Sequence, residues 1–260
     1  MPEITTDDGC RLHYQLDGRE DGPLLVFANS LGTALAMWDP QVPSLGEHFR
    51  ILRFDARGHG LSGIGAGAYG IDRLGRDVLS LLDHLGVAKA HFCGLSMSGM
   101  VGIWLGRQAP ERCLSLALCN TAALIGSKET WEARIAAVMA QGTAGITDAV
   151  IDRWFTEPFR ARAPAEVARI AVMLRTTPSA GYAAACAAIR DADLRAELGA
   201  IAVRTLVIAG TFDQSTTAAD GRFLAQGIPG ARYAELASAH LSNIEAAGDF
   251  TRTLSDFLSS

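Results

Sequence analysis

The sequence lacks the features that would place the chain in a membrane or an oxidising compartment. No apolar run approaches the roughly 20 residues needed to cross a bilayer, and the longest runs, such as 205–209, have the length of a strand. The N-terminus has no apolar signal-peptide core. The cysteines are odd in number, widely scattered and without CxxC spacing, a pattern typical of reduced thiols. We therefore expect a cytoplasmic protein with no metal site and no cofactor.

Clusters of positive charge are also missing. The formal net charge is −5 and no group of Lys and Arg stands out, so we do not expect nucleic acid as a partner. Hydrophobic residues make up 49% of the chain and charged residues 20%, which excludes a disordered protein. A length of 260 residues fits one large domain with room for an insertion. The oligomeric state is left open, a homodimer included.

What is present is an alternation of buried strands and helices. Helical periodicity occurs at 71–85 and 97–108, and the segment 3–16 alternates around a turn, which predicts an antiparallel hairpin. Strands followed by helices predict right-handed crossovers and a mainly parallel sheet. The continuous apolar runs typical of strands buried on both faces lie at 24–28, 51–54, 90–93, 114–118 and 205–209.

The alternation breaks between about 121 and 198. This stretch is rich in alanine and helical in pattern, and it contains no convincing buried strand. We therefore expect a helical cap at 121–198 inserted into a core formed by 1–120 and 199–260.

A serine stands where a predicted strand passes into a predicted helix. Gly94-Leu95-Ser96-Met97-Ser98 follows the run 90–93, and a sharp turn there would point the Ser96 hydroxyl outward at the carboxyl edge of the sheet. The backbone N–H of Met97, at the start of the helix, could donate to an oxyanion. The usual pattern is G-x-S-x-G, and Ser98 stands in place of its last glycine. The alternative is an ordinary strand-to-helix turn.

A serine nucleophile needs a base and an acid that orients the base. Of six histidines, His240 follows the predicted strand 232–236 at the same sheet edge as Ser96. Asp213 follows the run 205–209, and the chain order Ser, Asp, His matches one common hydrolase arrangement. The alternatives are a structural loop histidine, a turn aspartate, and Asp220 as the acid.

The loop after the first central strand is the expected source of a second oxyanion donor. In Phe27-Ala28-Asn29-Ser30-Leu31-Gly32-Thr33, Gly32 permits a tight turn and the N–H of Leu31 is the candidate donor. The Gly-rich loop 55–62 is predicted to be scaffold, its His59 included.

With these residues in place, the sequence resembles the α/β-hydrolase superfamily over its whole length. More narrowly it resembles the 3-oxoadipate enol-lactonases of bacterial aromatic catabolism. The segments that carry the narrower resemblance are Asn29-Ser30-Leu31-Gly32-Thr33, Met37-Trp38-Asp39, Arg153-Trp154-Phe155-Thr156 and His240-Leu241-Ser242-Asn243-Ile244-Glu245. The resemblance implies an eight-stranded, mostly parallel sheet flanked by helices, with a cap that helps to select the substrate.

The resemblance also implies a small anionic lactone as substrate and an acyl-enzyme on Ser96. A carboxylate on the lactone needs a counter-charge, for which Arg134 is the first candidate and Arg153 the second. Ser30 belongs to the segment that narrows the match, and we expect it near the substrate. Trp38, Trp154 and Tyr182 are candidates for an apolar pocket. For the arginines a solvated helix face, and for the aromatic residues plain core packing, are the alternatives.

Other activities would use the same residues. A general carboxylesterase, thioesterase or perhydrolase could rest on the same triad, because fold and triad do not fix the substrate. A haloalkane dehalogenase is disfavoured because its nucleophile is a carboxylate and position 96 is serine. A non-catalytic binding protein on the same fold is the alternative from another class, although such proteins often lose a triad member.

Overall fold

The computed structural model describes residues 2–260, which form one eight-stranded sheet with the strand order β1-β2-β4-β3-β5-β6-β7-β8. β1 and β2 form an antiparallel hairpin, β2 runs antiparallel to β4, and the remaining neighbours are parallel. The strands are β1 (Glu3–Thr5), β2 (Arg11–Gly18), β3 (Leu24–Ala28), β4 (Arg50–Phe54), β5 (Ala90–Leu95), β6 (Cys113–Cys119), β7 (Thr205–Gly210) and β8 (Arg232–Leu236).

The apolar runs of the sequence occupy the middle of this sheet. β3, β5 and β7 are buried along their whole length, because helices cover both faces of a parallel sheet. The predicted α/β fold with a mostly parallel sheet is confirmed.

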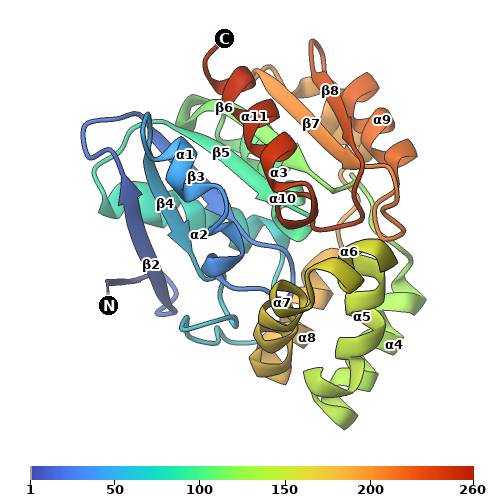
Figure 1. Cartoon of the computed structure of the whole chain (residues 1–260). Helices are drawn as coiled ribbons and strands as arrows, with labels where there is room; N and C mark the ends of the chain where they lie inside the picture. The colour runs from blue at the N-terminus through green and yellow to red at the C-terminus, as the bar shows by residue number, and fades with distance from the viewer. Residues whose placement is uncertain (1) are drawn as a thin grey trace.

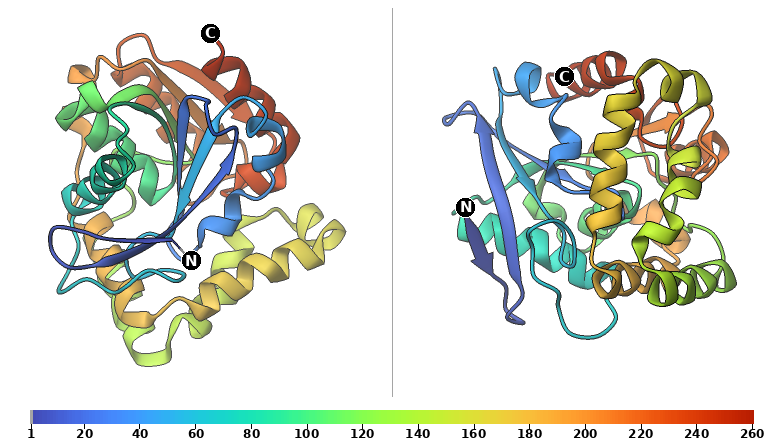
Figure 2. Two further views of the ribbon diagram at one scale, coloured as in Figure 1. Left: turned by 90° about the vertical axis from the view of Figure 1, so that its left-hand side faces the viewer. Right: turned by 60° about the horizontal axis from the view of Figure 1, so that its bottom comes forward.

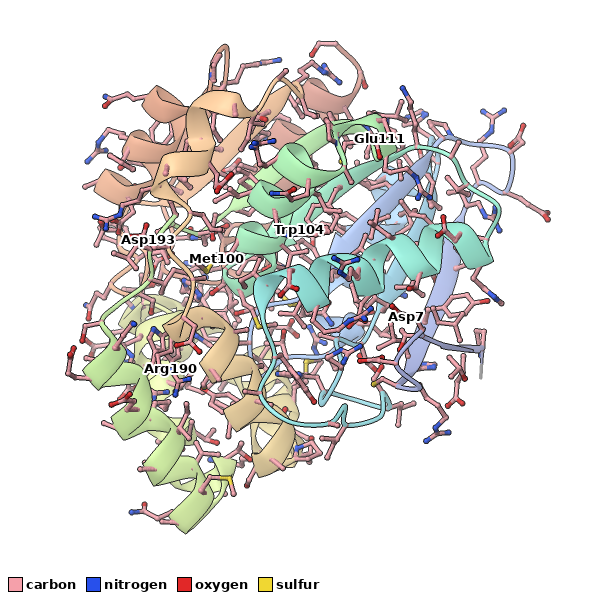
Figure 3. The ribbon with its side chains drawn as sticks, turned by 180° about the vertical axis from the view of Figure 1, so that it is seen from behind. Asp7, Met100, Trp104, Glu111, Arg190 and Asp193 are labelled. Atoms are coloured by element: carbon pink, nitrogen blue, oxygen red, sulfur yellow. The ribbon has the colours of Figure 1, made fainter. Side chains whose placement is uncertain are left out.

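Helices lie on both faces of the sheet. α1 and α11 pack together on one face, in front in Figure 1, and α2 and α3 pack together on the other, as Figure 3 shows from behind. Trp104 of α3 lies over Gly75 of α2, where an added Cβ would come within 2.1 Å of the indole ring. The core helices are α1 (Val42–Leu45), α2 (Ile71–His84), α3 (Met97–Gln108), α9 (Ala218–Gly227), α10 (Ser242–Glu245) and α11 (Ala247–Leu258), with 3-10 turns η1 (Leu35–Trp38), η2 (Pro110–Arg112) and η4 (Arg195–Ala200).

The chain between β6 and β7 forms a separate group of helices. They lie beyond the carboxyl ends of the parallel strands, at the bottom of Figure 1, and Figure 2 shows them from two further sides. Gly181 contacts Gly58 of the core so closely that a Cβ on Gly58 would meet its Cα at 2.5 Å. The group consists of α4 (Lys128–Gln141), η3 (Thr143–Ile146), α5 (Thr147–Trp154), α6 (Glu157–Arg162), α7 (Pro164–Thr176) and α8 (Ser179–Arg190).

Within residues 2–260, no helix combines the length and the apolar character that crossing a bilayer requires.

The loop after β4 is fixed by ion pairs between its buried Arg57 and two aspartates from other segments. Arg57 donates to Asp77 through Nε and Nη2, both at 2.6 Å, and to Asp8 through Nη1 at 2.8 Å. His59 is buried in the same loop with Nδ1 at 3.1 Å from the carbonyl of Arg57, as expected for scaffold.

Candidate active site

Ser96 occupies the turn between β5 and α3. Its φ is +59° and its ψ −116°, a conformation that L-residues rarely adopt and that the surrounding contacts must hold in place. The N–H of Ser96 donates to the carbonyl of Cys119 at 2.9 Å, and Thr121 Oγ1 donates to the carbonyl of Ser96 at 2.7 Å. These bonds tie the turn to the end of β6.

The small residues around this turn have different reasons for being small. A Cβ on Gly94 would lie 2.2 Å from the carbonyl oxygen of Ser98, and one on Gly99 would lie 2.4 Å from the side chain of Thr121. Both positions therefore require glycine. Position 98, where the usual motif has glycine, accommodates a serine whose hydroxyl donates to the carbonyl of Asn29 at 2.6 Å.

His240 and Asp213 form a buried pair behind the cavity. Asp213 follows β7 and His240 follows β8, so the two loops meet at the carboxyl edge of the sheet. Nδ1 of His240 lies 2.8 Å from Oδ2 of Asp213. A proton on Nδ1 shared with this carboxylate leaves Nε2 as the proton-accepting nitrogen.

The carboxylate of Asp213 is held by further donors. Oδ1 accepts from the N–H of Ser215 at 2.8 Å and of Thr216 at 3.1 Å, and Oδ2 accepts from Thr216 Oγ1 at 2.9 Å. Burial by itself would raise the pKa of Asp213, but the charge and hydrogen bond of His240 and these N–H groups outweigh it and lower the pKa. Asp213 is therefore held as a carboxylate.

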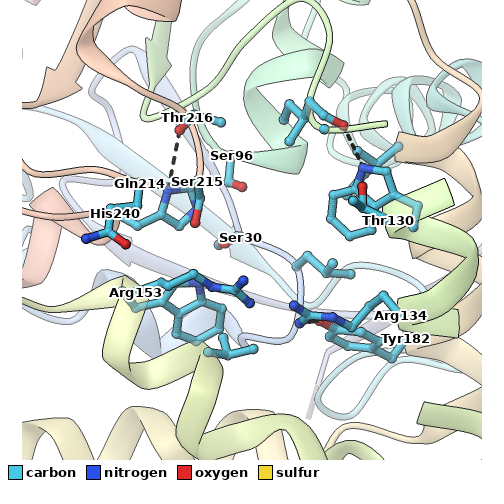
Figure 4. A pocket seen from close by; sticks show the side chains of 17 residues that line it. Ser30, Ser96, Thr130, Arg134, Arg153, Tyr182, Gln214, Ser215, Thr216 and His240 are labelled. Carbon is cyan, nitrogen blue, oxygen red and sulfur yellow. Dashed lines mark hydrogen bonds between the residues drawn. The ribbon is translucent and has the colours of Figure 1, made fainter. Parts of the chain in front are cut away.

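Asn120 and Thr216 are parts of this site that the sequence did not reveal. Asn120 follows β6 with a φ of +43°, and its Nδ2 lies 3.2 Å from Oδ2 of Asp213. Thr216 Oγ1 lies 3.4 Å from Nδ1 of His240, the contact drawn dashed on the left of Figure 4. The available signals were a polar residue directly after a buried strand and a hydroxyl three residues after the candidate acid.

Ser96 and His240 line the same cavity, with a volume of about 320 Å³. Among residues 2–260 no hydrogen bond joins their side chains, whereas both side chains face the cavity in Figure 4. In hydrolases this bond is often long without substrate and tightens when substrate is bound.

Two backbone N–H groups are the candidates for binding an oxyanion. Leu31 lines the cavity, and Met97 begins α3. Within the described chain, the N–H groups of both residues have no protein acceptor. The first N–H groups of a helix have no partner in the helix itself, so Met97 has a free donor at the positive end of the α3 dipole.

The cavity is closed by residues from two parts of the chain. The core contributes the serine, the histidine and the loops after β3 and β7, and the helices between β6 and β7 contribute the opposite wall. The lining residues are Ser30, Leu31, Ser96, Ile125, Gly126, Thr130, Trp131, Arg134, Val150, Arg153, Trp154, Tyr182, Ile189, Gln214, Ser215, Thr216 and His240.

Two arginines give this cavity a positive charge. Arg134 of α4 and Arg153 of α5 point their guanidinium groups toward one another across the cavity in Figure 4. Neither forms a salt bridge with a carboxylate of residues 2–260. Arg134 Nη1 lies 3.5 Å from the hydroxyl of Tyr182. Burial lowers the pKa of Arg153, and the charge of Arg134 lowers it further. Together they place two guanidinium groups, neither paired with a carboxylate of the described residues, at one cavity.

Of the candidate substrate residues, all but Trp38 line the cavity. They are Ser30, Arg134, Trp154 and Tyr182, together with the second candidate cation, Arg153.

The prediction for Trp38 is wrong. Its indole is 0% exposed, stacks on Phe27 at 4.4 Å between ring centroids, and donates from Nε1 to Asn29 Oδ1 at 3.0 Å. The 3-10 turn η1 directs this side chain into the core, away from the cavity.

The alternative acid and base residues lie elsewhere. Asp220 caps α9 by accepting from the N–H of Thr217 at 2.7 Å. His91 is buried in β5 with Nδ1 at 2.8 Å from Ser115 Oγ. In the part of the chain that the structure describes, no group of three or more His, Cys, Asp or Glu is arranged to hold a metal ion.

Comparisons with known proteins agree with this architecture. Residues 23–247 match the model of the alpha/beta hydrolase fold family. The chain is 40% identical to 3-oxoadipate enol-lactonase 1 of Acinetobacter baylyi, over 99% of this chain and 96% of the relative. The crystal structure of the enol-lactonase from Burkholderia xenovorans superposes with a TM-score of 0.98 at 48% identity, over the full length of both chains. A thermophilic esterase from Thermogutta terrifontis superposes with a TM-score of 0.93 at 27% identity, covering 99% of this chain and 97% of the esterase.

Proposed function

Because this chain belongs to the α/β-hydrolase fold family, and within it to the 3-oxoadipate enol-lactonases, it is a hydrolase, and we propose that it opens the lactone ring of 3-oxoadipate enol-lactone to give 3-oxoadipate. The observation that carries the proposal is one cavity in which Ser96 and His240 face two arginines without carboxylate partners. The first pair suits acyl transfer and the second suits a substrate with a free carboxylate.

In the proposed reaction, Nε2 of His240 takes the proton of Ser96 as the serine oxygen attacks the lactone carbonyl. The carbonyl becomes a tetrahedral oxyanion, which accepts hydrogen bonds from the N–H groups of Leu31 and Met97. Asp213, 2.8 Å from Nδ1, stabilises the imidazolium that forms and fixes the ring orientation.

The ring C–O bond then breaks and the enol oxygen leaves. An enolate is a good leaving group; it takes up the proton that His240 received from Ser96 and becomes the ketone of the product, which leaves His240 neutral again. The leaving group stays attached to the acyl-enzyme through the carbon chain, since a lactone is an internal ester. Water, deprotonated by His240, attacks the acyl-enzyme, and Ser96 is released with its proton restored.

We further propose that residues 121–198 act as a cap that selects anionic substrates. Arg134, Arg153, Trp154 and Tyr182 all come from this segment, whereas Ser96 comes from the core. Both arginines are partly buried, and the charge of Arg134 adds to burial in lowering the pKa of Arg153, so a carboxylate between them would offset that repulsion. A neutral ester of the same size would gain nothing from this site.

The test is a comparison of substrates. The purified protein is assayed on 3-oxoadipate enol-lactone and on neutral p-nitrophenyl esters of similar size, with Ser96→Ala as the control. The proposal expects a much higher kcat/KM on the lactone, and a loss on the order of 10⁶-fold in kcat for Ser96→Ala. A protein more active on the neutral esters would instead be a general esterase, and an active Ser96→Ala protein would exclude the serine mechanism.

A further inference from the structure

We propose that Ser98 is a positioning residue, which sets the distance between the two segments that carry the oxyanion donors. The proposal rests on the serine mechanism above. It concerns the position at which this chain departs from the usual motif, where a glycine could make no side-chain hydrogen bond.

Ser98 connects the helix of the nucleophile to the loop after β3. Its Oγ donates to the backbone carbonyl of Asn29 at 2.6 Å, and the side chain is buried, with the residue 4% exposed. Within residues 2–260 this is the hydrogen bond that joins the loop 29–33 to α3. Met97 precedes Ser98 by one residue, and Leu31 follows Asn29 by two. The bond therefore links the two segments that carry the oxyanion donors, at a point close to the N–H groups of both Leu31 and Met97.

Asn29 is fixed on its other sides as well. Its Nδ2 donates to the carbonyl of Phe54 at the end of β4 at 2.8 Å, and its Oδ1 accepts from Trp38 Nε1 at 3.0 Å. Farther along the loop, Thr33 Oγ1 donates to the carbonyl of Ser30 at 2.7 Å. The amide of Asn29 anchors the loop to β4 and η1, and the bond from Ser98 adds the anchor to α3.

This anchor matters because an oxyanion hole works by geometry. Donors must lie about 2.7–3.1 Å from the oxyanion, and removal of one donor typically lowers kcat by about 10²–10³-fold. Leu31 and Met97 belong to different segments, so relative movement of these segments weakens one of the two bonds. Ground-state binding of an ester is less sensitive, because the charge on oxygen develops only in the transition state.

The decisive variant is Ser98→Ala, which removes the donor and leaves the carbonyl of Asn29 without it. We expect kcat on p-nitrophenyl acetate to fall by about 10-fold or more with KM changed less than about 2-fold, as for a partly misplaced donor. The rate of labelling of Ser96 by a fluorophosphonate and the affinity for a boronic acid, which forms a tetrahedral adduct, should fall in parallel. Ser98→Thr retains a hydroxyl and should recover most of the loss.

Thermal unfolding and circular dichroism establish whether each variant is folded. If Ser98→Ala does not fold, Ser98→Cys takes its place, because cysteine is close to serine in size and is a weaker hydrogen-bond donor. Unchanged kcat, labelling rate and boronate affinity in folded Ser98→Ala would overturn the proposal. So would an equal loss in Ser98→Ala and Ser98→Thr, which would indicate packing rather than hydrogen bonding. These probes do not contain the lactone, so failure of the wild type on the lactone would refute the proposed substrate and leave the role of Ser98 to be decided separately.

Discussion

Glu245 accepts a hydrogen bond at 2.9 Å from the backbone N–H of Ala239, the residue that precedes His240. The same carboxylate accepts from the N–H of Thr156 at 3.3 Å and from its hydroxyl. Thr156 lies between α5 and α6, in the segment inserted between β6 and β7. The N–H of Leu241 also donates to the carbonyl of Trp154, at 3.2 Å. One buried carboxylate therefore joins the loop of His240 to the helices that close the cavity.

Replacing this carboxylate should affect both stability and turnover. Glu245→Gln places an N–H₂ group among donors from Ala239 and Thr156, and an unsatisfied buried donor costs about 1–3 kcal/mol. We expect a lower free energy of unfolding in urea and a lower kcat, because the loop of His240 loses a fixed contact. Glu20→Gln, at an exposed position, is the matched control. A variant with wild-type stability and kcat would show that the carboxylate does not couple the two segments.

Asp213→Asn should keep the fold and lose activity. The two backbone N–H groups that donate to Oδ1 favour the amide oxygen at that position, so the amide N–H₂ would face Nδ1 of His240. By donating to Nδ1 it would stabilise the wrong tautomer, in which Nε2 is protonated and unable to accept from Ser96. By analogy with other Ser-His-Asp enzymes, kcat should fall about 10⁴-fold. The measurement is esterase turnover beside a thermal unfolding curve. Asp220→Asn serves as the control, since Asp220 caps α9, and its turnover should stay near wild type.

The paired arginines should control affinity for charge rather than catalysis. Hydrogen bonds to charged groups are worth about 1.5–3 kcal/mol, so Arg134→Gln or Arg153→Gln should raise KM for an anionic lactone by about 10-fold or more. KM for a neutral ester should stay unchanged. Arg175→Gln is the control, because this arginine pairs with Asp148 at the surface. Equal effects on both substrates would argue against a carboxylate site.

His91 should make the protein sensitive to mild acid. Burial lowers its pKa to about 4, with the charge of Arg204 contributing, while a histidine in the unfolded chain has a pKa near 6.5. Between these values the unfolded state binds a proton that the folded state does not, so the free energy of unfolding falls as the pH drops from about 6.5 to about 4. The slope from one such group is at most about 1.4 kcal/mol per pH unit.

Urea unfolding at pH 7 and pH 5 tests this expectation. His91→Gln can still bond to Ser115 Oγ and should lose less stability between the two values than the wild type. His48→Gln, at an exposed position, should behave as the wild type. If the pH dependence of His91→Gln equalled that of the wild type, another group would be responsible.

The sequence predicted the parts of the molecule that depend on local pattern. Continuous apolar runs located the buried strands, and the strand-to-helix turn located Ser96. A single residue can also divide a helical stretch: α10 and α11 are separated at Ala246, whose φ is −118° and ψ 43°. Helical periodicity does not register a break of one residue.

Contacts between distant segments were harder to predict. For Trp38 the sequence left both the pocket and plain core packing open, because the turn η1 determines which way its indole points. Asn120 lies 93 positions from Asp213 in the sequence, and their hydrogen bond depends on the pairing of β6 with β7. Ser98 was noted as a departure from the motif, whereas its bond to Asn29 spans 69 positions and depends on how β3 and β5 pair.

The pairing of β6 with β7 also has a consequence for how this enzyme could change its substrate. The two strands are adjacent and parallel, with Leu116 opposite Thr205, although the whole helical insertion separates them in the chain. The insertion therefore leaves the sheet at the end of β6 and re-enters it at the neighbouring strand β7. We expect that an insertion of another length or sequence could replace it without changing the order of the strands. Recombination at its two ends could replace the wall that bears Arg134 and Arg153 while the machinery around Ser96 was inherited intact.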